Sequence, residues 1–341
     1  MKVLITGATG TIGHEICIQL LRRGHELTIV TRKSEEQLRS HWNLPVQILT
    51  WEDPAREPMP SEKLSDIEAV IHLAGESINQ RWSDSAKQRI LDSREQFTKK
   101  LVDGIHQHAP HVKTFVSASA IGIYPNAEST PQNEDSTIDS SDEFLPTVCR
   151  KWENASHNLK PSIRKCIVRI GVVLDQGQGF LGQLEPLYQK AIAGPIGSGN
   201  RYLSWIHIDD LVGLFIAALE NDKYNGVLNG TAPQPVTNQE FNSEFAKVNR
   251  VPNVIPVPPF ALKILFGEMS SLALSDQFII PEKSKNLGFQ FKYPTLEKAL
   301  GHLYAWKTHY LDRRMFQWQW IPHEIANPRL IFLRTQEILK K

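Results

Sequence analysis

Short apolar runs alternate with longer amphipathic stretches through the first half of the chain. The runs have the length of buried strands and the stretches have helical spacing, a pattern typical of a parallel sheet covered by helices on both faces. We therefore predict an α/β protein with a Rossmann-type, doubly wound parallel sheet. The predicted strands are Lys2–Thr6, Glu26–Thr31, Val46–Thr50, Ala69–Leu73, Thr114–Ser119 and Cys166–Arg169, and the predicted helices include His14–Arg23, Asp84–His108 and Pro146–Leu159.

The pattern changes beyond about Gly171. Two glycine-rich stretches, 177–182 and 194–199, are predicted to be loops, and the proline-rich stretch 251–259 is predicted to be a linker or a cluster of turns. We predict three parts. They are an NAD(P)-binding Rossmann domain at residues 1–230, a smaller and partly interleaved C-terminal α/β lobe at residues 231–300 that contributes to substrate binding, and an aromatic-rich extension at residues 301–341.

The extension alternates between apolar and polar residues over 313–321, which places Phe316, Trp318 and Trp320 on one face of an extended segment. We favour the interpretation that this segment packs on its own domain. The alternative is a docking arm for a second subunit or a partner, because exposed aromatic residues are costly without one. The chain is expected to be a monomer or a homodimer.

Charge and composition exclude several classes of protein. The formal net charge is +1, and 41% of the 341 residues are hydrophobic, which is ordinary for a globular protein and opposes a general nucleic-acid surface. Three cysteines without a Cys-x-x-Cys pair predict neither a disulfide framework nor a metal site. No apolar run approaches the roughly 18 residues of a membrane span, and no signal peptide is expected, so a cytoplasmic protein is predicted.

Gly7, Gly10 and Gly13 lie between the first predicted strand and the first predicted helix. Strand, glycine turn and helix form the context that a dinucleotide-binding fingerprint requires. Gly7 allows a tight turn, Gly10 lets the backbone approach a pyrophosphate, and Gly13 lets helix and strand pack closely. The helix N-terminus then directs unpaired N–H groups at phosphate.

The second predicted strand ends at Thr31, followed by Arg32 and Lys33. An NAD-selective site usually offers an acidic residue here to the ribose 2′-hydroxyl, whereas arginine and lysine favour a 2′-phosphate. We therefore predict NADP(H) as the cofactor. The alternative is a solvated charge pair at a strand end. Gly75, at the end of the fourth predicted strand, is expected to let the backbone pass close to the cofactor.

Five segments give the chain its resemblance to the extended short-chain dehydrogenase/reductase superfamily. They are TGATGTIG at Thr6–Gly13, HLAG at His72–Gly75, SASAIGIY at Ser117–Tyr124, RIGVV at Arg169–Val173 and WIHIDD at Trp205–Asp210. This resemblance implies the same Rossmann fold. The residues expected to bind NADP(H) are Gly7, Thr9, Gly10, Thr11, Ile12, Gly13, Arg32, Leu73, Ala74, Gly75 and Ser117.

More narrowly, the chain is similar to an "epimerase family" subgroup that includes the bacterial YfcH-like proteins and a plant relative linked to chloroplast division. The shared segments are LAGE at Leu73–Glu76, RW at Arg81–Trp82, SR at Ser93–Arg94, CxxWE at Cys149–Glu153, GPIGSG at Gly194–Gly199 and a C-terminal domain of unknown function ending near Leu300. The resemblance covers roughly residues 1–300, and the extension lies outside it.

The chain departs from the catalytic pattern of that superfamily. Ordinary members use Tyr-x-x-x-Lys, and extended members often place a glutamate four positions after the lysine. Anchoring on Glu153 places Cys149 at the lysine position and Leu145 at the tyrosine position, where neither can do the same chemistry. Arg94 replaces the helical asparagine, and the serine is retained as Ser119.

Another group must therefore move the proton if the protein is an enzyme. Tyr124 is the first candidate and Glu76 the second, held by Arg81 or Arg94, while each also has a purely structural interpretation. His207 is a weaker candidate, because Asp209 or Asp210 is expected to cap the helix that follows.

The substrate is predicted only as a small polar molecule. Arg169 and Arg201 are candidate contacts, and each is also explained by a structural ion pair. Two functions remain open: an NADP(H)-dependent oxidoreductase or sugar-epimerase-like enzyme in which Ser119 orients the reacting oxygen, and a non-catalytic NADP(H)-binding scaffold or regulator in cell division or redox sensing.

Overall fold

A central sheet organises the computed structural model, which describes residues 1–341 apart from 41, 128, 191–193, 252–267, 269–273 and 313–341. Within this described part, the sheet has seven strands in the order β10-β6-β5-β4-β1-β2-β3, and all their pairings are parallel. The strand order reverses between β1 and β4, which is where ligands bind in open α/β sheets. The predicted doubly wound fold is confirmed.

The six predicted strands lie close to their predicted positions because each is an apolar run buried on both faces, whereas the other five strands were not predicted. Only strand ends differ, by one or two residues. The strands are β1 Lys2–Thr6, β2 Glu26–Thr31, β3 Gln47–Thr50, β4 Ala69–His72, β5 Thr114–Ala120, β6 Arg164–Ile170, β7 Val172–Leu174, β8 Tyr202–Leu203, β9 Trp205–His207, β10 Gly226–Gly230 and β11 Val236–Thr237.

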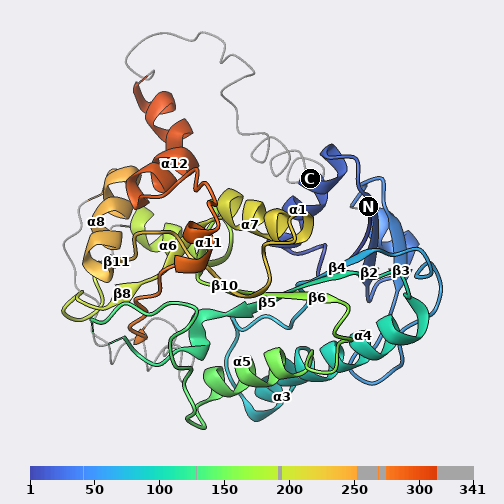
Figure 1. Ribbon diagram of the computed structural model, residues 1–341. Helices are drawn as coiled ribbons and strands as arrows, with labels where there is room; N and C mark the ends of the chain where they lie inside the picture. The colour runs from blue at the N-terminus through green and yellow to red at the C-terminus, as the bar shows by residue number, and fades with distance from the viewer. Residues whose placement is uncertain (41, 128, 191–193, 252–267, 269–273, 313–341) are drawn as a thin grey trace.

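Helices cover both faces of the sheet (Figure 1). Helices α3, α4 and α5 pack against one face, and α1 and α7 pack together against the other. The helices are α1 Thr11–Arg22, α2 Glu35–Arg39, α3 Asp84–Asp92, α4 Glu95–His108, the 3-10 turn η1 Ile121–Ile123, α5 Phe144–Asn154, α6 Gly179–Gln189, α7 Ile208–Glu220, α8 Asn238–Asn249, α11 Glu282–Asn286 and α12 Leu296–Asp312.

One prediction about a helix and one about a loop are wrong. The stretch 84–108 is not one helix, because it breaks at Ser93, whose hydroxyl donates to the Ile90 carbonyl and accepts the backbone N–H of Glu76. The stretch 177–182 is not only a loop, since α6 begins at Gly179. Periodicity did not reveal the break, because α3 and α4 are both amphipathic.

A second lobe is built from segments on both sides of β10. Strand β8 pairs with β11, and α8 packs against α12 around a separate apolar core that includes Phe241, Phe245 and Tyr304. The lobe is therefore interleaved with the Rossmann core, and α12 runs across the expected boundary at residue 300. The predicted aromatic face at 313–321 lies outside the described residues, so its packing stays a prediction.

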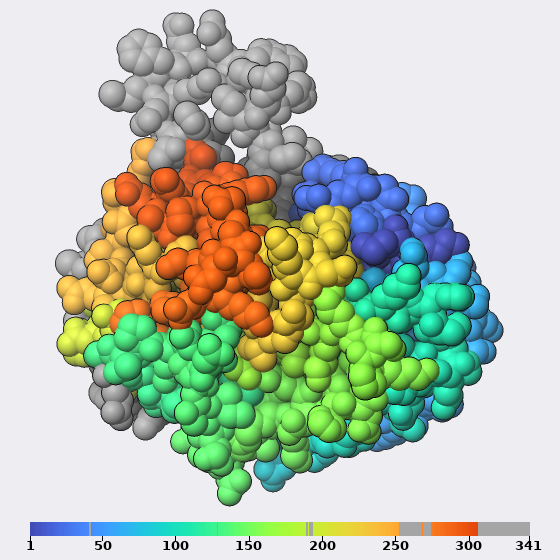
Figure 2. Space-filling model, in the orientation of Figure 1, coloured from blue at the N-terminus to red at the C-terminus, as the bar shows by residue number. Residues whose placement is uncertain are grey.

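The segment at 276–280 joins the second lobe to the loop that follows β5. Backbone hydrogen bonds connect Ala127 to Asp276 and Gln132 to both Phe278 and Ile280. Figure 2 shows the orange C-terminal segment lying against the green loop and the yellow helix α7. Residues 276–280 thus lie along the loop that follows the carboxyl end of β5.

The segment 207–210 connects β9 to α7, but its aspartates do not have the predicted role. His207 is the N-cap of α7, and its Nδ1 accepts the backbone N–H of Asp209 at 3.0 Å. Asp210 is buried, and its carboxylate accepts the backbone N–H groups of Lys292 and Tyr293 at 2.8 and 2.9 Å. The predicted cap by Asp209 or Asp210 is wrong, because the carboxylate of Asp210 instead binds the second lobe to α7.

Within the part of the chain that the structure describes, no helix combines the length and the apolar character needed to cross a membrane.

We expect the Asp210→Ala variant to lower the free energy of unfolding by about 2–4 kcal/mol, because the backbone N–H groups of Lys292 and Tyr293 both lose their acceptor. Urea unfolding followed by circular dichroism measures the loss. Asp222→Ala is the control, because Asp222 is an exposed partner of Arg164 and should cost less than about 1 kcal/mol. Equal losses in the two variants would contradict the role of Asp210.

Candidate functional site

Polar side chains form a row across the carboxyl ends of five neighbouring strands. Thr6 pairs in register with His72, and His72 with Ser117. Two positions further along β5, Ser119 pairs with Arg169, and Arg169 with Asn229. All six side chains are at most 5% exposed. This row marks the edge where a doubly wound sheet binds its ligand.

The glycine turn at the end of β1 has the geometry that a phosphate-binding turn needs. Gly7 has φ +74°, and a Cβ there would lie 2.8 Å from the backbone nitrogen of Ala74. A Cβ on Gly13 would lie 2.3 Å from the carbonyl oxygen of Gly7, so only glycine lets α1 pack this closely. A Cβ on Gly10 would meet only the Gly7 carbonyl oxygen, at 3.4 Å, so its outer side is open.

Helix α1 begins without a side-chain cap. Its N-cap is Gly10, and no side chain accepts from the first turn. The N–H groups of Thr11, Ile12 and Gly13 therefore have no acceptor within the helix. Together with the exposed Thr9, they form a set of donors that fits a diphosphate.

Arg32 and Lys33 lie at the carboxyl end of β2, next to this turn in the sheet. Both side chains are exposed. The backbone there is held by Thr31, whose hydroxyl accepts the N–H of Lys33 at 3.1 Å, and by Thr50, which donates to the carbonyl of Lys33. The two cations therefore project from a fixed strand end, which suits a phosphate on the adenosine ribose.

His72 joins the strand ends to the helix layer. The Thr98 hydroxyl donates to the carbonyl of Arg94 at 2.5 Å, so it accepts from Nε2–H of His72 at 2.9 Å. The Nδ1 of His72 then accepts from Thr6, 2.7 Å away, and the Thr6 oxygen accepts the backbone N–H groups of Leu73 and Ala74. Burial, with the Arg94 charge as a smaller cause, lowers the pKa of His72 to about 3.

Ser119, Tyr124 and Arg169 belong to one buried network centred on Glu153. Ser119 donates to Glu153 at 2.7 Å, and Arg169 binds both carboxylate oxygens through Nε and Nη2 at 2.8 and 2.9 Å. The Nη1 of Arg169 donates to the Tyr124 hydroxyl, which donates to the side chain of Asn229. Burial raises the pKa of Tyr124, although Arg169 opposes the shift.

The positions of the usual Tyr-x-x-x-Lys pair carry apolar contacts. Leu145 packs in a cluster with Trp82, Ile90 and Val148. Cys149 is buried beside Ile121, and burial raises the pKa of its thiol to about 12. Neither side chain can transfer a proton near neutral pH.

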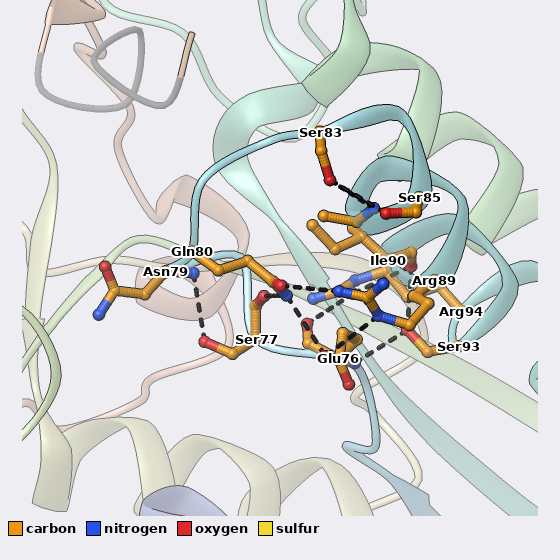
Figure 3. Close-up of polar contacts among 11 residues, drawn as sticks. Glu76, Ser77, Asn79, Gln80, Ser83, Ser85, Arg89, Ile90, Ser93 and Arg94 are labelled. Carbon is orange, nitrogen blue, oxygen red and sulfur yellow. Dashed lines mark hydrogen bonds and ion pairs between the residues drawn. The ribbon is translucent and has the colours of Figure 1, made fainter. Parts of the chain in front are cut away.

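Glu76 lies in a different cluster, on the loop that follows β4 (Figure 3). Its carboxylate accepts from Gln80 at 3.3 Å and lies 3.9 Å from Nε of Arg89. The expected partner Arg94 instead donates to the backbone carbonyl of Glu76, and Arg81 is exposed. Arg89 is therefore the cation nearest to the Glu76 carboxylate.

Gly75 contacts a side chain that the sequence had not connected to it. A Cβ on Gly75 would lie 3.0 to 3.2 Å from the guanidinium atoms of Arg94. The glycine thus makes room for Arg94, whereas its expected contact with a cofactor stays a prediction.

The two arginines predicted to contact substrate lie apart in the fold. Arg169 is 5% exposed and fully engaged by Glu153 and Tyr124. Arg201 is exposed in the second lobe and donates to the backbone carbonyl of Leu274. The substrate role of each stays a prediction, and for Arg169 the geometry favours a positioning role.

His207, Asp209 and His302 have ligand atoms within 4.8 Å of one another. The Nδ1 of His207 accepts an N–H, so a neutral ring carries its proton on Nε2, which faces Nδ1 of His302 at 3.1 Å. His207 then keeps no lone pair for an ion. These groups form a hydrogen-bonded histidine pair rather than a metal-ligand set.

Three residues that organise the site were not among the predicted cofactor, catalytic or substrate residues: His72, Arg94 and Glu153. For Glu153 a signal existed, since it occupies the position of a family glutamate. The hydrogen bonds of His72 with Thr6 and Thr98 depend on strand register and helix packing, so no local sequence pattern predicts them.

Two family models match the chain. The model described as NAD dependent epimerase/dehydratase family matches residues 3–229, and a domain of unknown function matches residues 257–303. These matches confirm the resemblance drawn from the motifs.

Individual relatives agree with this assignment. An epimerase family protein SDR39U1 homolog, chloroplastic, from Arabidopsis thaliana is 38% identical over 88% of this chain and 86% of its own length. A crystal structure of human epimerase family protein SDR39U1 with NADPH superposes with a TM-score of 0.80 at 33% identity, covering 89% of this chain and 99% of that one. A nucleoside-diphosphate sugar epimerase from Corynebacterium glutamicum gives a TM-score of 0.72 at 28% identity, covering 100% of this chain and 67% of that one.

The buried His72 predicts a loss of stability in mild acid. An unfolded histidine titrates near pH 6.5, whereas the native pKa of His72 is about 3. As the pH falls below about 6.5, the unfolded chain binds a proton that the native protein does not, so the free energy of unfolding falls. At pH 5 this single group costs about 2 kcal/mol relative to pH 7.

Urea unfolding at pH 7 and pH 5 tests this, with His72→Gln as the comparison. The amide can still accept from Thr6 and donate to Thr98, but it does not titrate. The pH-dependent loss should therefore be about 2 kcal/mol smaller in the variant than in the wild type. Identical losses would show that His72 does not cause the acid sensitivity.

Proposed function

Since the chain belongs to the NAD dependent epimerase/dehydratase family, we propose that it binds NADP(H) across the carboxyl ends of β1, β2 and β4. The observation that carries this proposal is the combination of an uncapped α1 with two exposed cations at the end of β2. The first turn offers backbone donors to a diphosphate, and Arg32 with Lys33 offers charge to a 2′-phosphate. The human relative that was crystallised with NADPH supports the same choice of cofactor.

We propose further that the protein transfers hydride to or from a small polar substrate. When bound, the nicotinamide supplies the hydride donor or acceptor, and the protein must place the substrate oxygen and handle its proton. Ser119 is the residue best placed for this, because its hydroxyl donates to Glu153 and its oxygen keeps the capacity to accept. Arg169 fixes Glu153 through two hydrogen bonds, which holds Ser119 in turn.

The other two candidates have weaker support. The Tyr124 hydroxyl is engaged by both Arg169 and Asn229, which favours a positioning role. Glu76 is partly exposed on the loop after β4, so it remains a candidate for proton transfer at that side of the site.

A second candidate function is a non-catalytic NADP(H)-binding scaffold. The apolar packing of Leu145 and Cys149 favours it, because the residues at those positions normally complete the acid/base machinery. Under this proposal the nucleotide would stabilise a conformation that a partner protein recognises, and no substrate would oxidise or reduce the nucleotide.

A reducing compartment such as the cytoplasm fits the chain. Cys17, Cys149 and Cys166 are all free and buried. Burial raises the pKa of each thiol to about 12, so none is prepared to form a disulfide at neutral pH.

Calorimetric titration tests the cofactor. We expect the wild type to bind NADPH more tightly than NADH, and Arg32→Ala to weaken NADPH binding about tenfold or more by losing a charge-assisted contact. The affinity for NADH should change little. Arg23→Ala is the matched control, since Arg23 is another partly exposed arginine, paired with Glu220 at the far end of α1. Equal affinity for the two nucleotides would contradict the assignment of the 2′-phosphate.

Absorbance of the reduced nicotinamide distinguishes the enzyme from the scaffold. A screen of small hydroxy and carbonyl compounds should reveal one that oxidises bound NADPH or reduces NADP+. Ser119→Ala should then lower turnover by about 100-fold or more, while Tyr124→Phe should act mainly through stability. Turnover that survives both substitutions would remove this assignment of roles, and a cofactor that stays unchanged through the screen would favour the scaffold.

A further inference from the structure

Arg94 places a guanidinium at the carboxyl edge of the sheet, at the break between α3 and α4. It lies against the bare face of Gly75, directly after β4, and over the ring of Trp152 at 5.0 Å. It is also close enough to Cys149 for the two groups to influence each other's pKa. Arg94 therefore brings a positive charge to the place where the family's lysine is missing.

Only one end of this guanidinium is engaged. Nη1 donates to the carbonyl of Glu76 at 3.0 Å, to the carbonyl of Ile90 at 3.1 Å and to the hydroxyl of Ser93 at 3.4 Å. Figure 3 shows these contacts, which hold the loop after β4 to the end of α3. Among the described residues, Nε and Nη2 of Arg94 donate no hydrogen bond, and neither is a buried atom without a partner. Nε and Nη2 are therefore not completely shut off from solvent, although most of the side chain is buried.

In Arg169 the corresponding Nε–Nη2 edge binds a carboxylate. There Nη1 donates to Tyr124, and the Nε–Nη2 edge binds both oxygens of the Glu153 carboxylate. Arg94 has its Nη1 placed in the same manner, but no carboxylate of the described residues lies within 4.0 Å of its guanidinium. The Glu76 carboxylate, whose charge influences the pKa of Arg94, lies within 4.0 Å of Arg89 instead.

The burial of Arg94 strengthens the attraction between its unpaired Nε–Nη2 edge and an anion. Desolvation lowers the pKa of Arg94, and Cys149 and Glu76 only partly oppose the shift. A cation held away from water gains more from an anion than an exposed one does. The carbonyl oxygens and the Trp152 ring compensate part of the charge, and the remaining two donors point to an anionic partner.

We propose that the Nε–Nη2 edge of Arg94 binds a carboxylate group of the substrate. This inference rests on the proposed function and adds a substrate class to it: a small hydroxy or oxo compound that carries a carboxylate. A planar carboxylate fits the two parallel donors, whereas a hydroxyl uses only one of them. Glycine at position 75 favours this placement, because a Cβ there would lie 3.0 to 3.2 Å from the guanidinium atoms and would push them aside by a few tenths of an ångström.

Acetate and acetamide provide the probe pair. The two molecules have nearly the same size and shape, but only acetate carries a charge. The protein is first saturated with NADP+, which calorimetry verifies, and ligand-observed NMR then follows the methyl signal of each probe up to about 100 mM, a range suited to weak binding. We expect saturable binding of acetate and much weaker binding of acetamide.

Two arginine variants locate the binding. Arg94→Gln should weaken acetate binding about tenfold to a hundredfold, because a charge-assisted pair of hydrogen bonds is lost. Arg89→Gln removes an equal charge from the neighbouring turn of α3, and it should leave acetate binding within about twofold of the wild type. Equal weakening in both variants would overturn the proposal in favour of a general positive field.

Other outcomes also decide the question. Equal binding of acetate and acetamide, or tighter binding of inorganic phosphate than of acetate, would overturn the assignment of a carboxylate. If Arg94→Gln does not fold, Arg94→Lys serves instead. Lysine keeps the charge but lacks the two parallel N–H donors of the guanidinium. Acetate affinity equal to the wild type in this variant would contradict bidentate binding. A wild type that fails to bind NADP+ contradicts the proposed function, while NADP+ binding without acetate binding overturns only this inference.

Discussion

Polar groups that are buried together must satisfy one another, and this requirement shapes the carboxyl edge of the sheet. Five strands end in side chains that face the helices α3, α4 and α5, where little water reaches them. Every donor and acceptor in the row therefore needs a fixed partner. The tautomer of His72, the orientation of Glu153 and the conformation of the loop after β4 all follow from this pairing.

The site has two parts: an interior of side chains held by hydrogen bonds to one another, and a rim of groups around it. Ser119, Tyr124 and Arg169 are held by Glu153 and Asn229, so a ligand contacting them would find them already oriented, without a cost in side-chain entropy. The rim consists of the first turn of α1, the end of β2 and the free edge of Arg94. Under the proposed function, recognition of charged groups is concentrated at this rim.

The sequence predicted those parts of the molecule that depend on local pattern. Six strands were located to within one or two residues, because a strand buried on both faces reads as an apolar run. The glycine turn was identified because Gly7 and Gly13 meet steric limits that no other residue satisfies. The break at Ser93, the capping by His207 and the burial of Tyr124 depend on which groups meet across the fold, so no local spacing reveals them.

The hydrogen bonds between residues 127–132 and 276–280 have a consequence for how the chain matures during synthesis. A ribosome adds about 5–20 residues per second, so the glycine turn leaves the tunnel on the order of tens of seconds before Ile280 does. During that interval the nascent sheet can form its nucleotide-binding edge, but Asn229 still lacks the carbonyl of Ile280 as an acceptor. The contacts made by residues 276–280 therefore form only after the glycine turn and the first strands have emerged.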